Sequence, residues 1–303
     1  MNQGRATAIG SISVVLWGTL ALLTQLTGNQ IPPFQMLFMT FAIAWALMMV
    51  KGLLLGPAPL KQLRQPLRAW LLGVGGLFGY HLCYFAAMAL APAVEVSLLA
   101  YLWPLLIVLF SALLPGQRLL AVHLVGALMA LVGCWLLLDR GDSGFETQYL
   151  AGYALALGCA LIWSTYSVAS RLVASVPTDA VGWFCGATAL AGLVCHLLWE
   201  AWIWPQQALQ WVGILGLGLG PVGIAFFTWD HGVKHGDLRL LGVLAYGAPL
   251  VSTVLLVLAG FAEPGWALML ASLLIVGGAL VAGVGPWLIS KGSTEAAAEP
   301  AAD

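Results

Sequence analysis

Polar residues divide the sequence into ten long apolar stretches. A helix needs about 20 apolar residues to cross the hydrocarbon core of a membrane, whereas a membrane strand is shorter and alternates in polarity. The pattern therefore predicts an all-α membrane protein with ten transmembrane helices. These lie near residues 7–27, 33–55, 69–90, 93–113, 119–138, 149–173, 179–199, 208–231, 238–259 and 266–289.

Two junctions between these stretches are short. LAPAV (90–94) and GFAEPG (260–265) each separate two apolar stretches by a few residues. Pro and small polar residues at both places favour a chain reversal over a continuous helix. A count of nine or eleven spans stays open as the alternative if either junction is misread.

The composition supports the membrane interpretation. Hydrophobic residues make up 61% of the 303 residues, charged residues only 8%, and the mean hydropathy is +0.97. A soluble domain carries about 25% charged residues because its surface faces water. The five cysteines lie inside apolar stretches without a CxxC pair. We therefore expect no structural disulfide, no metal site and no cofactor.

The basic residues predict the topology. With ten spans and the N-terminus inside, only Arg140 falls on the outer side. Positively charged residues concentrate in cytoplasmic loops, so both termini are expected in the cytoplasm of a bacterial inner-membrane protein. The polar tail from Lys291 to Asp303 is expected to be disordered. The basic residues on the inner side are Arg5, Lys51, Lys61, Arg64, Arg68, Arg118, Arg171, Lys234, Arg239 and Lys291.

One phrase occurs twice. LAYLWPL (99–105) and LAYGAPL (244–250) share five of seven residues at a shift of 145, and the same shift aligns Gly126 with Ala271 and Gly133 with Gly278. We therefore divide the chain into a first five-helix repeat (1–140), a second (141–290) and a tail (291–303). Because five is odd, the second repeat enters the membrane from the opposite side. Inverted repeats of this kind are typical of alternating-access carriers.

Several motifs resemble one transporter family. The stretches LWGT (16–19), GYHLCYFAAMALAPA (79–93) and LAYLWPL resemble the EamA branch of the drug/metabolite transporter superfamily, and in combination its aromatic amino acid exporters. The resemblance covers about residues 7–289. It departs after the fourth helix, where many members carry Gly-Glu and this chain has PGQR (115–118). The resemblance implies a secondary transporter that exports aromatic and other mostly neutral amino acids, with an exporter of drugs, nucleosides or other small metabolites as the alternative.

Candidate substrate-binding residues lie near the middle of the spans. His81 is ionisable in the third span, where such a group usually faces a cavity or a partner, and Tyr84 shares its helix face. Pro104 and Pro249 remove backbone donors in the fourth and ninth spans, so we expect helix breaks that act as hinges there. Duplicated Trp and Tyr positions complete the set. The candidate residues are Trp17, Tyr80, His81, Tyr84, Tyr101, Trp103, Trp163, Tyr166, Ser167 and Tyr246.

This set favours an amino-acid substrate. Aromatic rings can hold an ammonium group over their faces, and no Arg or Lys is expected at mid-membrane to bind a phosphate. Glu95 and Asp230 fall near span ends, where either could couple a proton; a solvated position or the neighbouring Lys234 explains them equally well. An intramembrane enzyme is disfavoured, since the chain has no GxSxG, HExxH or DDxxD motif. Two repeats in one chain form a complete pathway, so we expect a monomer.

Overall fold

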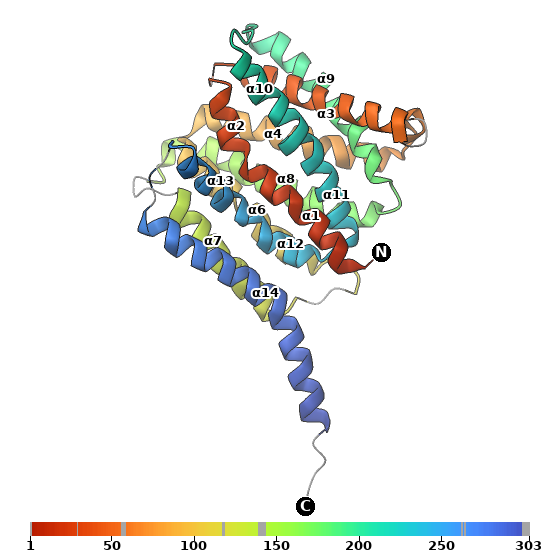
Figure 1. Ribbon diagram of the computed structural model, residues 1–303, viewed down its shortest axis with the longest axis vertical. Coiled ribbons are helices and arrows are strands. Elements are labelled where there is room, and N and C mark those ends of the chain that lie inside the picture. Colours follow the sequence, from red (N-terminus) through yellow and green to blue (C-terminus); the bar gives the residue numbers. More distant parts are fainter. Residues whose placement is uncertain are drawn as a thin grey trace, which may run out of the picture.

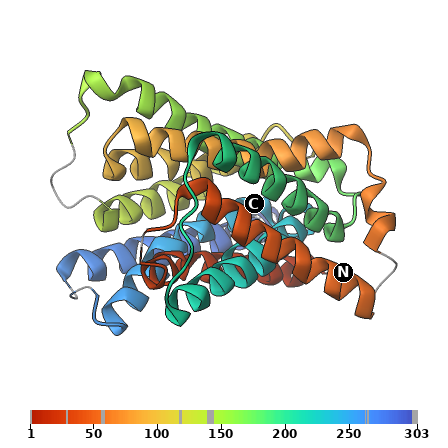
Figure 2. The ribbon, with the colours of Figure 1, turned by 90° about the horizontal axis from the view of Figure 1, so that it is seen from above.

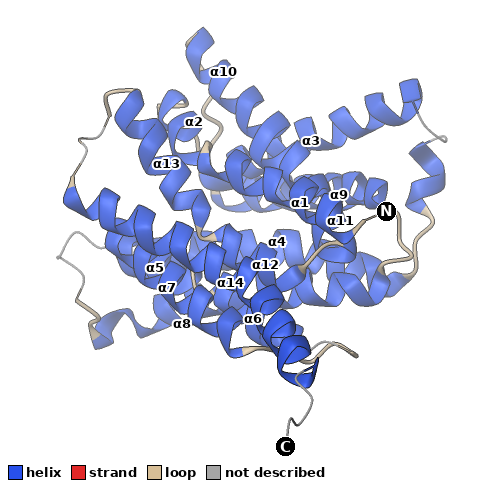
Figure 3. Ribbon diagram, turned by 60° about the horizontal axis from the view of Figure 1, so that its bottom comes forward, coloured by secondary structure: helices blue, strands red, loops and turns tan. Residues whose placement is uncertain are grey.

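Ten membrane-length helical segments make up the computed structural model, which describes residues 2–28, 30–55, 59–116, 119–138, 144–261, 263 and 265–298. Within these residues every regular element is helical (Figure 3). The ten predicted spans are confirmed over the described part of the chain, and their ends differ from the predicted ones by no more than four residues.

Six spans consist mainly of one helix, and four are divided. The undivided spans are built on α3 (Pro33–Leu55), α4 (Leu67–Leu90), α7 (Ala121–Leu138), α8 (Leu150–Ala169), α9 (Val181–Trp199) and α14 (Trp266–Ala298). The divided spans are α1 and α2 (Gln3–Gly18 and Leu20–Leu26), α5 and α6 (Ala93–Ala100 and Trp103–Ser111), α10 and α11 (Ala208–Leu217 and Ala225–His235), and α12 and α13 (Leu238–Ala245 and Gly247–Leu258).

Helix breaks occur at both expected prolines. Pro104 lies in the first turn of α6, and Pro249 lies in the first turn of α13. Proline is tolerated there because the backbone N–H of a first turn has no partner within the helix. The eighth span is interrupted differently, by a π-helical segment around Pro221 (Gly218–Ile224) that joins α10 to α11.

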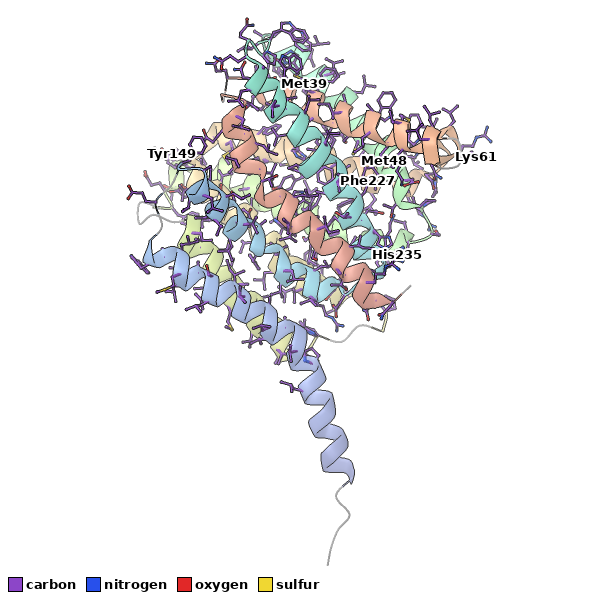
Figure 4. All side chains as sticks on the ribbon, viewed as in Figure 1. Met39, Met48, Lys61, Tyr149, Phe227 and His235 are labelled. Atoms are coloured by element: carbon purple, nitrogen blue, oxygen red, sulfur yellow. The ribbon has the colours of Figure 1, made fainter. Side chains whose placement is uncertain are left out.

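Both ends of the chain lie at the same end of the bundle. The start of α1 and the far end of α14 lie on the side of Lys61 and His235, whereas Tyr149 lies on the opposite side (Figures 1 and 4). The bias of basic residues assigns the first side to the cytoplasm. We therefore call it the cytoplasmic end and the other the periplasmic end. Arg118 and Arg140, which the topology prediction used, lie outside the described residues.

The C-terminal tail differs from the expected disorder. Helix α14 continues to Ala298, so residues 291–298 are helical, while residues 299–303 lie outside the described part. The sequence STEAAAE explains the difference, because Ala and Glu are strong helix formers that can extend an existing helix into water.

The two halves of the chain pack against each other helix by helix. Helix α1 packs on α11, α3 on α9, α4 on α8 and α7 on α14, so each of these pairs joins one repeat to the other. Figure 2 accordingly shows the colours of the two halves interleaved rather than separated into two lobes.

Contacts between α7 and α14 show the inverted symmetry directly. A Cβ atom built on Gly126 would lie 2.5 Å from the carbonyl oxygen of Gly278, and one built on Gly133 would lie 2.9 Å from that of Ala271. The repeat shift of 145 maps Gly126 onto Ala271 and Gly133 onto Gly278, so it converts each of these contacts into the other. The two contacts are thus one contact repeated with exchanged partners, as a two-fold axis requires. Small residues allow this close approach, which drives helix association in lipid.

A second exchanged pair connects the ends of four helices. A Cβ atom on Gly152 would lie 3.1 Å from the backbone nitrogen of Ala91, and one on Gly236 would lie 2.9 Å from that of Thr7. A shift of 145 again converts Thr7 into Gly152 and Ala91 into Gly236. The inverted repeat predicted from the sequence therefore holds at both ends of the bundle.

We expect Gly126→Val to destabilise the protein, because its Cβ atom would clash with the backbone of α14. Overpacking of a tight contact costs about 1–3 kcal/mol, and the thermal unfolding temperature in detergent should fall accordingly. Gly75→Val is the matched control, since Gly75 is an exposed helical glycine with no atom within 4 Å of an added Cβ. Equal unfolding temperatures for the two variants would contradict this account of the interface.

Candidate functional site

Four tryptophans meet at the centre of the bundle, two from each repeat. Trp17 (α1), Trp103 (α6), Trp163 (α8) and Trp229 (α11) form this four-tryptophan cluster, in which each ring contacts at least two others. The rings of Trp17 and Trp229 are closest, with centroids 5.1 Å apart. Trp17 and Trp163 contact each other at 5.7 Å, and the repeat aligns them, with one residue of slippage from the shift of 145, through LWGT (16–19) and IWST (162–165). Equivalent residues touch in this way only near the axis that relates the two repeats.

Hydrogen bonds fix two of these rings. The Trp17 Nε1–H donates to the carbonyl oxygen of Pro221 at 3.0 Å, within the π-helical segment. The Trp229 Nε1–H donates to the Ser167 hydroxyl at 3.0 Å. Buried indole N–H groups need such partners. Ser167, a predicted site residue, thus orients a tryptophan in this conformation.

The predicted residues of α4 continue the cluster toward the periplasmic end. The ring of Tyr80 contacts Trp163 at 5.6 Å and is stacked on Tyr84 at 5.9 Å. His81 contacts Phe41 of α3 at 5.2 Å. Tyr80, His81 and Tyr84 are only partly buried, although their rings face neighbouring helices.

The hydrogen bond of His81 determines its tautomer. Its Nδ1 lies 2.7 Å from the carbonyl oxygen of Leu77, one turn earlier in α4. A carbonyl can only accept, so Nδ1 carries the proton and a neutral ring presents Nε2 as an acceptor. A substrate ammonium group is a donor that this nitrogen can bind.

The tyrosines of the repeated phrase have different roles. Tyr101 is partly buried, whereas Tyr246 is fully buried and its hydroxyl accepts a hydrogen bond from the backbone N–H of Leu105 at 3.1 Å. Leu105 lies in the first turn of α6, where backbone N–H groups have no partner within the helix. The tyrosine of the second repeat therefore caps the broken helix of the first.

Tyr166 extends the cluster in the opposite direction. Its ring contacts Trp163 at 5.2 Å, and it packs on Gly76 of α4, where no larger side chain would fit. Tyr166 is buried, unlike the tyrosines of α4. The structure thus brings the predicted residues together but divides them between a partly buried periplasmic group and a buried cytoplasmic group.

The buried positions of α4 lie mainly in its cytoplasmic half. In α4, the buried positions are Ala69, Gly73, Gly76 and Leu77 in the cytoplasmic half and Ala87 alone in the periplasmic half. Helix α2, the periplasmic part of the first span, has no buried residue. Helix α4 is thus packed closely on the cytoplasmic side of the four-tryptophan cluster, where a Cβ atom added to Gly73 or Gly76 would clash with Phe184 or Tyr166.

Two residues of the site were not predicted from the sequence. Trp229 belongs to the four-tryptophan cluster, and Phe226 contacts both Trp17 and Trp163. The repeat could have identified both residues, since a shift of 145 maps the predicted site residues Tyr84 and His81 onto Trp229 and Phe226. Extending the alignment from the fourth and ninth spans back into the third and eighth would have found both.

Among the described residues no group of His, Cys, Asp and Glu is arranged to hold a metal ion. All five cysteines are free thiols, and four of them are buried. The chemistry of the site thus rests on aromatic rings, hydroxyls and one imidazole.

Comparison with known proteins gives a consistent result. Residues 5–139 and 150–284 each match the EamA-like transporter family. The aromatic amino acid exporter YddG of Ancylobacter novellus is 54% identical over 284 residues, covering 93% of this chain and 98% of that protein. YddG of Escherichia coli K12 is 28% identical over 96% of this chain and 99% of that protein. A crystal structure 53% identical in sequence superposes with a TM-score of 0.90 over 93% of this chain and 98% of that chain.

We expect Tyr246→Phe to lower the thermal unfolding temperature, because it leaves the buried N–H of Leu105 without its acceptor. An unsatisfied buried donor costs about 1–3 kcal/mol. Tyr101→Phe is the control at the equivalent position of the other repeat and should have a smaller effect. If both variants unfold at the same temperature in detergent, the capping role of Tyr246 is wrong.

Proposed function

The chain belongs to the EamA-like transporter family, and we propose that it exports aromatic and other mostly neutral amino acids from the cytoplasm by alternating access. Its ten spans and its bacterial relatives make it a multi-pass protein of the inner membrane, and membership of a transporter family makes it a carrier rather than an enzyme. The four-tryptophan cluster at the axis between the repeats is the observation that carries the proposal.

The proposed site matches the chemistry of an aromatic amino acid. Tyr80, Trp163 and Phe226 offer ring faces and edges, and aromatic pairs favour edge-to-face or offset contacts beyond the area they bury. Polar groups on side chains that adjoin these rings include the Tyr80 and Tyr84 hydroxyls and His81 Nε2. They would bind the ammonium and carboxylate groups while the rings hold the side chain.

Alternating access would follow from the exchange of two similar conformations between the repeats. In the present conformation α4 is packed closely on the cytoplasmic side of the cluster, and its partly buried residues Tyr80, His81 and Tyr84 lie toward the periplasmic side. The breaks at Pro104 and Pro249 would serve as hinges, because a helix already interrupted can bend without losing further backbone hydrogen bonds. Both repeats lie in one chain, so we propose that a monomer is the transporting unit.

Substrate class is tested with purified protein in proteoliposomes. We expect counterflow of labelled phenylalanine, slower counterflow of threonine, and none of a nucleoside or a cationic dye. Transport of the nucleoside or the dye, with no movement of either amino acid, would contradict the proposal and favour a drug or metabolite exporter.

The site is tested by Trp163→Ala and His81→Ala, which should each slow phenylalanine transport by about tenfold or more, because each removes a contact of at least ~1.4 kcal/mol. Trp135→Ala is the matched control, since Trp135 lies on α7 with 41% of its surface exposed. All three variants should be expressed at equal levels in the membrane. Unchanged rates of phenylalanine transport in both site variants would contradict the assignment of Trp163 and His81 to the substrate-binding site.

A further inference from the structure

A buried ion pair lies between the four-tryptophan cluster and the cytoplasm. Asp230 and Lys234 are one turn apart in α11, with Oδ2 and Nζ separated by 2.9 Å and only 3% of each side chain exposed. Asp230 follows Trp229 directly in the chain. Of the two explanations given from the sequence, the structure shows the pairing with Lys234 and not the solvated position.

Two further hydrogen bonds connect the pair to the chain segment between the sixth and seventh spans. The Lys234 ammonium donates to the carbonyl oxygen of Val176 at 2.9 Å, and the Thr178 hydroxyl donates to Asp230 Oδ2 at 2.7 Å. These bonds join α11 to the residues just before α9. The pair is therefore satisfied in this conformation by groups that belong to another part of the bundle.

Such a pair is poorly explained by stability alone. Removing two charges from water has a desolvation penalty that their attraction only partly offsets, and apolar residues of similar volume are often as stable or more stable. Ionisable groups inside a membrane protein usually face a pathway or a functional partner. A role beyond packing is therefore the better explanation.

The surroundings of the pair place it on the route from the cytoplasm to the cluster. Asp230 and Lys234 border a cavity of about 10 Å³, whose other walls include Leu72 and Gly73 of α4 and Tyr166 of α8. This volume is about the size that one water molecule requires. Since Tyr166 also contacts Trp163, the cavity adjoins the ring cluster on its cytoplasmic side.

The repeat gives this position a counterpart at the periplasmic end. Helix α4 ends before Ala91 and α11 ends before Gly236, so the shift of 145 holds across both helices. It maps Asp230 onto Phe85 and Lys234 onto Ala89. Phe85 is partly buried and contacts His81 at 6.0 Å. When the repeats exchange conformations, Asp230 would face the half that opens to the cytoplasm.

We propose that Asp230 and Lys234 form the cytoplasmic entry site for the zwitterionic end of the amino acid, an inference that rests on the proposed export function. Asp230 binds the α-ammonium group and Lys234 binds the α-carboxylate when the cytoplasmic half is open. In the present conformation the two side chains close on each other and on Val176 and Thr178. Charge-assisted hydrogen bonds to both ends of a zwitterion exclude molecules that lack either charge.

Inverted membrane vesicles test the proposal, because they expose the cytoplasmic face of the full chain to added ligands. Uptake of labelled phenylalanine gives its KM, and competition gives the inhibition constants of phenethylamine, which lacks the carboxylate, and of 3-phenylpropionate, which lacks the ammonium group. Wild-type protein should favour phenylalanine over both by about tenfold or more, as expected for one lost charged hydrogen bond.

The double variant Asp230→Asn, Lys234→Gln removes both charges without leaving either unpaired. Its KM for phenylalanine should rise about tenfold more than the inhibition constant of either analogue, because phenylalanine loses two charged contacts and each analogue loses one, so that the three values converge. The control variant Lys51→Gln, Asp179→Asn breaks an exposed ion pair of 2.6 Å at the same end of the bundle and should keep the wild-type values.

If the ion pair only holds the cytoplasmic half closed, the double variant should change the KM for phenylalanine and both inhibition constants by the same factor. Retention of the wild-type preference for phenylalanine in the double variant would overturn the proposal. If the double variant does not fold, Lys234→Arg is tested instead. This variant should raise the KM but keep the preference for phenylalanine over the two analogues. Loss of that preference in Lys234→Arg would also contradict the proposal. Absence of phenylalanine uptake by wild-type vesicles would instead refute the export function.

Discussion

A broken helix can exist inside a membrane only where another group satisfies its free backbone atoms. Two such breaks determine the centre of this protein, and in both cases an aromatic side chain of the opposite repeat supplies the partner. The hydroxyl of Tyr246 accepts the N–H of Leu105 at the start of α6, and the indole of Trp17 donates to the carbonyl of Pro221 in the π-helical segment. The aromatic residues therefore hold the two repeats in register as well as lining the proposed site.

The two halves of the bundle differ in the charges they bury. The cytoplasmic half contains the close contacts of α4 with Phe184 and Tyr166 and the buried Asp230–Lys234 pair. An inverted repeat allows the opposite arrangement with little change inside each repeat. The residues that would close the periplasmic half are not equivalent in charge, because Phe85 and Ala89 occupy the positions of Asp230 and Lys234. An asymmetry of this kind affects affinity at each face, but it cannot by itself drive net export, which needs a gradient of substrate or of a coupled ion.

Much of the fold could be predicted from the sequence. Long apolar stretches define spans, an odd number of spans in a duplicated unit defines an inverted repeat, and a proline within a span indicates a break. The rotation of each helix could not be predicted, because the apolar residues of α1 and α3 are not concentrated on one face and the pattern does not distinguish the interior from the lipid. For this reason the capping role of Tyr246, the place of Trp229 in the cluster and the burial of Asp230 and Lys234 required the three-dimensional arrangement. A duplicated position indicates that a residue matters, but not which way its side chain points.

The central claim is that the two ends of the pathway open alternately around the four-tryptophan cluster. Spin labels at Arg68 and His235 report the cytoplasmic ends of α4 and α11, and labels at Leu90 and Leu209 report the periplasmic ends of the same two spans. All four positions are exposed, and the five native cysteines can be replaced. Pulsed electron paramagnetic resonance with and without phenylalanine should show one distance lengthening while the other shortens. Two distances that stay fixed, or that change together in the same direction, would contradict the account.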